Sequence, residues 1–285
     1  TSQQKGLEDT FGELGIEIVA VTDANFSAET QVSNIETVMA KKPDILVSIP
    51  TDATATADAY KQAAAAGIKI VFMDQRANGL EAGKDYVSVV SADNYGNGYA
   101  SGTVLGDALG GKGKVAMVYY DANFAPTNQR DEGFRDAMKN YPDIEIVTEQ
   151  GFTDESGCAE QGDAILTQFP NIDGIYASWD VPMEGVLSAV RAAGMEGKVT
   201  LACNDLGNNV AREIASGNIA GGGAQMPYDQ GVAEAKLAAL ALLGEETPSY
   251  VAVPAETVTH ENVLEAYTDV YHVATPDWLK EAYVE

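Results

Sequence analysis

The sequence predicts an α/β fold built from two copies of a doubly wound parallel-sheet unit. Apolar runs of strand length alternate along the chain with segments of helical periodicity, which is the pattern of βαβ units. The stretch 172–205 holds two such runs, separated by a helical segment that ends at Gly194. A near twin runs from 43 to 74, with Gly67 in the place of Gly194. The alternation and the duplication together predict two α/β domains.

Composition excludes several classes of partner. The 285 residues are 45% hydrophobic, enough for two domain cores, and 17 Lys and Arg oppose 43 Asp and Glu for a net charge of −26. Such a charge repels phosphate backbones and anionic lipid surfaces, so we expect no nucleic-acid partner. The sequence as given contains no apolar run of membrane-spanning length and no signal peptide.

The first half begins with an amphipathic pattern over residues 1–14 that stops at Gly15, which predicts a helix. Ile16 to Val21 then reads as a strand. The continuously apolar run from Ile45 to Ile49 is typical of a strand buried on both faces of a parallel sheet. The other elements expected before residue 92 are helices over 31–41 and 53–66 and strands over 68–73 and 86–90.

The second half repeats this order. A helix is expected over 97–109, a strand over 114–120, a helix over 130–140, a strand over 144–149 and a helix over 159–168, followed by the stretch 172–205. Beyond it we expect a helix over 210–216, a Gly-rich strand over 219–225, a helix over 229–243, an extended segment over 250–254 and a helical tail.

Aligning the two copies places Thr1 opposite Asn128, inside the loop that leads into a helix. The second copy has a strand and loop before that point, and the first copy has neither. A central strand is hard to omit from a parallel sheet, so we expect ~15 to 20 residues, the size of a strand with its loop, to be missing before Thr1.

No motif for a metal, a cofactor or a nucleophilic triad stands out. Cys158 and Cys203 lack metal-ligand spacing, and they form either one disulfide or, as the sequence favours, two free buried thiols. The segment from Gly106 to Gly113 resembles a phosphate-binding loop only superficially, because no Ser or Thr follows Lys112. We therefore expect no metal, no cofactor and no catalytic residue.

Polar residues follow the predicted strands, at the edge where ligands bind open parallel sheets. Asp74 and Asp205 are not followed at once by a helix, which favours ligand binding, whereas Asp52 precedes a helix and is better read as its cap. For Asp180 the two interpretations balance, since Trp179 beside it offers a stacking surface. Carboxylates, amides and aromatic rings at one edge suit a polyhydroxylated ligand.

Several motifs in this order resemble the type I periplasmic binding proteins, the sugar-binding subunits of ABC importers similar to ribose-binding protein. The resemblance rests on DILVSIPTDATATADAYKQAAAAGIKIVFMDQ, SADNYGNG, TNQRDEGF, GIYASWDVPMEGV, NDLGNNVAREI and AQMPYDQGVAEAKLA. It implies two Rossmann-like domains joined by a three-segment hinge, with residues 1–91 and 227–252 in the N-terminal lobe and residues 92–226 and 253–285 in the C-terminal lobe.

The resemblance also implies a cleft between the lobes that closes on a monosaccharide or sugar alcohol. The implied ligand-binding residues are Asp74, Gln75, Asn128, Arg130, Trp179, Asp180, Asp205 and Gln225. Trp179 stands where the family often has an amide. The implied partners are a small neutral sugar or polyol and a membrane ABC permease. The expected state is a monomer, either periplasmic or anchored by lipid outside the cell.

Three alternatives remain. The first is a carbohydrate-active enzyme that uses Asp180 and Asp205 as acid and base. The second is a receptor that presents its ligand to a chemotaxis sensor. The third, a regulator of the lac-repressor type, is disfavoured because such regulators carry a DNA-binding module and the charge of −26 opposes DNA.

Overall fold

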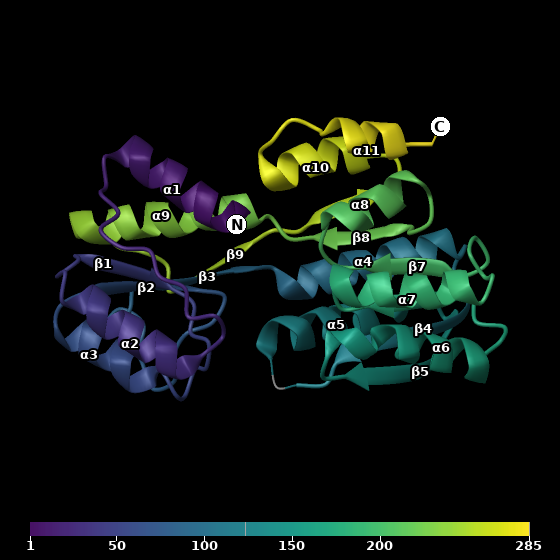
Figure 1. Ribbon diagram of the computed structural model, residues 1–285, viewed down its shortest axis with the longest axis horizontal. Helices are drawn as coiled ribbons and strands as arrows, with labels where there is room; N and C mark the ends of the chain where they lie inside the picture. The colour runs from purple at the N-terminus through teal and green to yellow at the C-terminus, as the bar shows by residue number, and fades with distance from the viewer. Residues whose placement is uncertain (123, 285) are drawn as a thin grey trace. The chain divides into compact units, whose positions relative to one another are not determined.

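Two parallel sheets organise the protein, one in each of two units (Figure 1). The computed structural model describes residues 1–122 and 124–284. The first unit contains Thr1–Ala92 and Pro227–Val253, and the second contains Asp93–Met226 and Pro254–Glu285. The chain therefore passes from one unit to the other at three places, after Ala92, after Met226 and after Val253.

The first unit holds a sheet of four parallel strands in the order β1-β2-β3-β9. Because β9 comes from the segment that returns late in the chain, this sheet is assembled from residues far apart in sequence. Its elements are α1 (Ser2–Leu14), α2 (Ala28–Met39), β1 (Ile45–Ser48), α3 (Ala57–Ala65), β2 (Lys69–Met73), β3 (Ser88–Ala92), α9 (Pro227–Leu243) and β9 (Tyr250–Val253).

Helices cover both faces of this sheet, with α2 and α3 on one side and α1 and α9 on the other (Figure 1). The core beneath α2 and α3 centres on Tyr60 and Phe72, whose rings meet edge to face at 5.0 Å. Coverage on both faces explains why β2 is apolar after Lys69 and why all five residues of β3 are buried. The doubly wound architecture predicted from the alternation is confirmed.

The predicted strand over 16–21 is wrong. Residues 16–24 carry no strand pairing, and among the described residues β1 has a ladder partner only in β2. A groove of about 860 Å³ lies between residues 16–26 and β1. An apolar run becomes a strand only where a neighbouring backbone offers hydrogen bonds, and here the groove separates the run from the sheet edge.

The second unit holds a six-stranded sheet in the order β10-β8-β7-β6-β4-β5, parallel except for the β10–β8 pair. The antiparallel edge strand β10 is not among the elements that periodicity predicts. The elements are α4 (Asn94–Ala108), β4 (Lys112–Tyr120), α5 (Ala125–Met138), β5 (Asp143–Phe152), α6 (Cys158–Gln168), β6 (Gly174–Ala177), α7 (Asp180–Ala192), β7 (Thr200–Cys203), α8 (Asn208–Ala215), β8 (Gly221–Ala224), β10 (Glu256–Thr259), α10 (Val263–Tyr271) and α11 (Asp277–Ala282), with a short 3-10 helix at Glu155–Gly157.

Two apolar clusters fill this unit, one on each face of the sheet. Cys158 and Cys203 are both buried in the larger cluster, and both are free thiols, as the sequence favours. Glycines in β8 let α4 approach the sheet closely. A Cβ on Gly223 would lie 2.3 Å from the backbone oxygen of Asn97, so larger residues do not fit there.

One helix begins earlier than predicted, in a segment that was expected to be a loop. Helix α5 begins at Ala125, five residues before the predicted start at Arg130, with Pro126 in its first turn. Proline at a helix start removes an amide that has no partner in any case, so it favours this earlier beginning. None of the described helices has the length and apolar character needed to cross a membrane.

Candidate ligand site

Asp74 and Asp205 share an unusual backbone geometry at equivalent places in the two units. Both lie just beyond the end of a parallel strand and have positive φ, 56° and 69° respectively. The amide of Asp74 donates to the carbonyl of Val90 at 2.7 Å, and that of Asp205 donates to the carbonyl of Gly223 at 2.8 Å. A left-handed non-glycine residue costs about 1 kcal/mol and clusters at functional sites. Both units therefore present an aspartate held in a strained conformation at the carboxyl edge of the sheet.

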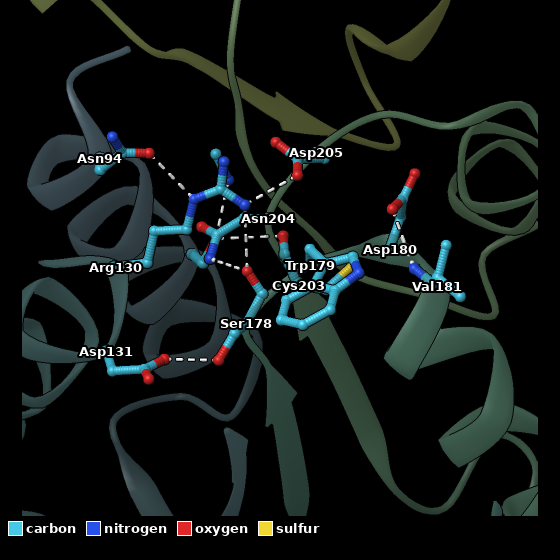
Figure 2. Close-up of polar contacts among 12 residues, drawn as sticks. Asn94, Arg130, Asp131, Ser178, Trp179, Asp180, Val181, Cys203, Asn204 and Asp205 are labelled. Carbon is cyan, nitrogen blue, oxygen red and sulfur yellow. Dashed lines mark hydrogen bonds and ion pairs between the residues drawn. The ribbon is translucent and has the colours of Figure 1, made fainter. Parts of the chain in front are cut away.

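In the second unit, Asp205 is paired with Arg130 (Figure 2). The Arg130 Nη1 donates to Asp205 Oδ2 at 2.8 Å, and its Nε donates to Asn94 Oδ1 at 3.2 Å. The arginine side chain is 7% exposed and the aspartate side chain is 16% exposed. A buried guanidinium requires a compensating charge. Here Arg130, on α5, finds that charge in the carboxylate of Asp205 at the strand end.

A buried network of hydrogen bonds holds the Arg130 side chain in place. Its Nη1 also donates to the carbonyl of Ser178, which accepts a second bond from Asn204 Nδ2 at 2.9 Å. The hydroxyl of Ser178 in turn donates to Asp131, and burial raises the pKa of Asp131 to about 6. Buried hydrogen-bond networks of this kind hold side chains in one arrangement.

Asp180 stands at the first position of α7, where its Oδ1 accepts from the amide of Val181 at 2.9 Å. Burial, and to a lesser extent the nearby charge of Asp205, raise its pKa to about 6. Near neutral pH, Asp180 therefore carries a proton part of the time. It can donate to a ligand oxygen as well as accept from a hydroxyl.

Trp179 forms an aromatic wall with its neighbours. Its ring lies 5.7 Å from that of Tyr120 and 5.1 Å from that of Phe152, and its Nε1 donates to Glu155 Oε1 at 3.0 Å. A cavity of about 500 Å³ opens within this unit, a volume suited to a small ligand. Its lining includes Tyr120, Phe124, Trp179, Arg130, Asp154 and Glu155.

In the first unit, Asp74 accepts hydrogen bonds from two neutral side chains. Its Oδ1 accepts from the hydroxyl of Ser91 in β3 and from the side-chain amide of Gln230 in α9, both at 3.3 Å. Gln75 beside it is half-buried, and its Nε2 donates to the carbonyl of Pro50 at 2.8 Å. Asp74 and Gln75 are thus neighbours at the end of β2, with Gln75 engaged by backbone.

The predicted residues Asn128 and Gln225, and the predicted cap Asp52, are not in the lining of this cavity. Asn128 is exposed on α5 and is not in the lining of the cavity, whereas Arg130 two positions later is in it. Gln225 follows β8 and is half-buried. Asp52 receives amide hydrogen bonds from Thr54 and Ala55, both at 2.8 Å, so it caps a turn. The prediction that it caps the helix is wrong, because α3 begins only at Ala57 and its N-cap is Thr56.

Sequence reasoning missed Ser178, Asp131, Gln230, Asn94 and the aromatic residues Tyr120 and Phe124. Asp131 and Gln230 sit on helices among other polar residues, where they read as part of a solvated face. Tyr120 and Phe124 flank the end of a predicted strand, so the position that singled out Trp179 could have singled them out too.

The chemistry of the site is that of hydroxyl recognition. Strand-end carboxylates accept hydrogen bonds, the Asp180 carboxyl can also donate, and the indole of Trp179 offers an apolar face. Among the described residues, no group of three or more His, Cys, Asp and Glu side chains is arranged to hold a metal ion.

Comparison with protein families identifies one match. The family described as "Periplasmic binding protein domain" matches residues 1–246. Among curated relatives, the D-ribose/D-allose-binding protein of Pseudomonas aeruginosa is 30% identical over 241 residues, which is 81% of this chain and 74% of that protein. The ribose import binding protein of Bacillus subtilis is 28% identical over 68% of this chain, and the match spans 62% of that protein's length, less than two thirds.

Solved structures show the same fold. An ABC transporter periplasmic solute binding protein from Actinobacillus succinogenes, with bound D-allose, aligns with a TM-score of 0.82 and 31% identity over 92% of this chain and 93% of that one. An ABC transporter solute binding protein from Agrobacterium vitis, bound with α-D-tagatopyranose, aligns with a TM-score of 0.81 and 27% identity over 97% of this chain and 94% of that one.

Proposed function

The chain belongs to the periplasmic binding protein family, and on this premise we propose that it captures a monosaccharide or sugar alcohol outside the cytoplasm and delivers it to an ABC permease. Its relatives support this role, since they are named as ribose-, allose- and xylose-binding proteins and several solved structures hold sugars.

One observation carries the proposal most strongly. The two strand-end aspartates, one in each unit, hold the same strained backbone conformation, with positive φ and an amide bonded to the adjacent strand. A fold retains such strain where a side chain must be presented in one direction. Two carboxylates presented in this way suit two groups of hydroxyls on one sugar ring.

The proposed ligand forms hydrogen bonds with groups of both units. In this proposal the first unit contributes Asp74 and Gln75. The second unit contributes Asn128, Arg130, Trp179, Asp180, Asp205 and Gln225.

The role of each group follows from its surroundings. Arg130 and Asp205 form a rigid ion pair. In this proposal the pair directs N–H donors and a carboxylate oxygen toward ligand hydroxyls. Trp179 covers the C–H face of the sugar. The pKa of Asp180 is about 6. The ionised carboxylate accepts a hydrogen bond from a sugar hydroxyl, and the protonated carboxyl donates one to a ring oxygen.

The proposal makes the protein a monomeric, non-enzymatic receptor located in the periplasm or tethered outside the cell. The elevated pKa of Asp180 beside Asp205 is the one feature that favours a carbohydrate-active enzyme. Incubation with aryl glycosides tests that alternative, because a receptor binds without forming product and an enzyme releases the aryl alcohol.

The direct test is a thermal-shift screen against pentoses, hexoses, inositols and short polyols. A ligand that binds only the folded state raises the melting temperature, by an amount that grows with its concentration above Kd. At least one sugar or polyol is expected to raise the transition in a saturable manner. If none of these classes moves it at millimolar concentration, the protein is not a receptor for them.

A further inference from the structure

A buried polar row on α9 lies behind Asp74 in the first unit. Gln230 and Glu234 are 1% and 0% exposed, although both belong to a helix with solvent-exposed positions. They are four residues apart, so they occupy the same face of the helix, one turn from each other. Burying two polar side chains in a helix that packs on a sheet is costly unless hydrogen bonds replace those lost to water.

Each side chain uses one end and leaves the other without a hydrogen-bond partner among the described residues. Gln230 donates through Nε2 to Asp74 Oδ1 at 3.3 Å, and its buried Oε1 has no partner. Glu234 accepts through Oε1 from Gln3 Nε2 at 2.6 Å, and its buried Oε2 has no partner. Among the described residues, the side chains of Gln230 and Glu234 therefore share no hydrogen bond with each other.

Glu234 adds little negative charge to this part of the helix. Burial raises its pKa to about 8, an effect that the charge of Asp74 increases and the bond from Gln3 decreases. At neutral pH the side chain is therefore a neutral carboxylic acid with a hydrogen to donate. The Asp74 carboxylate fixes the orientation of the Gln230 amide, because only the NH₂ group of the amide can donate to a carboxylate oxygen.

The helix that carries this row is itself fixed by close backbone packing. A Cβ on Gly231 would lie 2.0 Å from the backbone oxygen of Gln3, and a Cβ on Gly6 would lie 2.1 Å from that of Tyr228. Helices α1 and α9 therefore meet backbone to backbone, as their crossing in Figure 1 shows. This contact sets the distance from Gln230 to the strand end within the unit.

We propose that Gln230 is a positioning residue for the sugar site, which orients the Asp74 carboxylate. Ser91 and Gln230 approach the same oxygen, Oδ1, from β3 and α9. Two donors on one oxygen fix the plane of the carboxylate and hence the direction in which it meets a ligand hydroxyl. The inference rests on the proposed function, because it assigns Asp74 to ligand binding.

The first test compares sugar affinities by calorimetry, with a sugar identified in the thermal-shift screen. Gln230→Met keeps the volume and removes the donor, so it is expected to weaken binding about tenfold while leaving the melting temperature nearly unchanged. Gln62→Met is the matched control, because Gln62 is exposed on α3 in the same unit. Equal loss of affinity in both variants would overturn the proposal.

The second test asks whether Gln230 acts through Asp74. In an Asp74→Asn background, Gln230→Met should cause little further loss of affinity, because the carboxylate it orients is absent. A general structural defect would instead add to the effect of Asp74→Asn. Additive losses in this double-mutant cycle contradict a positioning role.

A ligand-free measurement separates this inference from the proposed function. The side-chain amide of Gln230, observed by NMR in labelled protein, should exchange slowly with water and should shift and lose protection in Asp74→Ala. If no sugar binds but this coupling is present, the proposed function fails and the Gln230–Asp74 contact stands. If the amide does not respond to Asp74→Ala, the positioning role is wrong whatever the protein binds.

Discussion

The two units present equivalent aspartates in the same backbone conformation but hold the carboxylates by different means. Asp205 is neutralised by a buried arginine, with Nη1 to Oδ2 at 2.8 Å. Asp74 meets a serine hydroxyl and a glutamine amide, both at 3.3 Å. The backbone conformation therefore repeats between the copies, whereas these hydrogen-bond donors differ. A duplicated fold can keep its ligand-presenting geometry while the polar partners behind it diverge.

This comparison predicts a large difference in stability between two identical substitutions. Asp205→Ala leaves Arg130 buried without its counter-charge and is expected to cost about 3 to 5 kcal/mol. Asp74→Ala removes hydrogen bonds from neutral donors and is expected to cost about 1 kcal/mol. Urea unfolding of both variants measures the difference, and the strain of placing alanine at positive φ is common to both. Equal losses would show that the Arg130 pair is not what distinguishes the units.

The next effect concerns pH and belongs to the first unit. Glu234 ionises near pH 4.5 when unfolded and at about 8 when folded, so in this interval the native state holds a proton that the unfolded state has lost. Its contribution to stability is complete below pH 4.5 and decreases by about 1.4 kcal/mol per pH unit up to pH 8.

Glu234→Gln removes this dependence. Between pH 6 and 8, above the values of about 6 for Asp131 and Asp180, the wild type should lose stability more steeply than the variant. Unfolding measured at pH 6, 7 and 8 provides the two slopes. Parallel slopes would mean that Glu234 is already ionised in the folded protein.

The smallest expected effect tests the backbone that the two units share. At Asp74 and Asp205, glycine should be more stable than alanine by about 1 kcal/mol, because glycine adopts positive φ without strain. At Glu36, exposed within α2, the order should reverse by about the same amount. If alanine were equal to glycine at either aspartate, the left-handed conformation would not be strained there.

The sequence could predict most of the architecture, because alternating apolar runs and helical segments directly reflect a doubly wound sheet. The failure at residues 16–21 has a physical cause, since the run lies across a groove from β1 and finds no backbone to pair with. Strand β10 was missed for the converse reason. It is short, and it is a strand only because β8 lies beside it.

The candidate site could be predicted only in part. Asp74 and Asp205 follow strands without a helix after them, so their place in the chain indicates a role. Their partners Arg130 and Gln230 come from helices distant in sequence, and Gln230 resembles any polar helical residue until the packing of α9 is known. Periodicity assigns a face to a residue, but it does not identify what that face contacts.

Calorimetric titration of a sugar from the screen into wild type, Asp74→Asn and Asp205→Asn tests the central claim most directly. Asparagine keeps the size of each side chain while removing the charge that accepts two hydroxyl hydrogen bonds. We expect each variant to weaken binding by about tenfold or more, since hydrogen bonds to a charged acceptor are the stronger ones. Unchanged affinity in both variants would contradict the claim that the two strand-end aspartates bind the ligand.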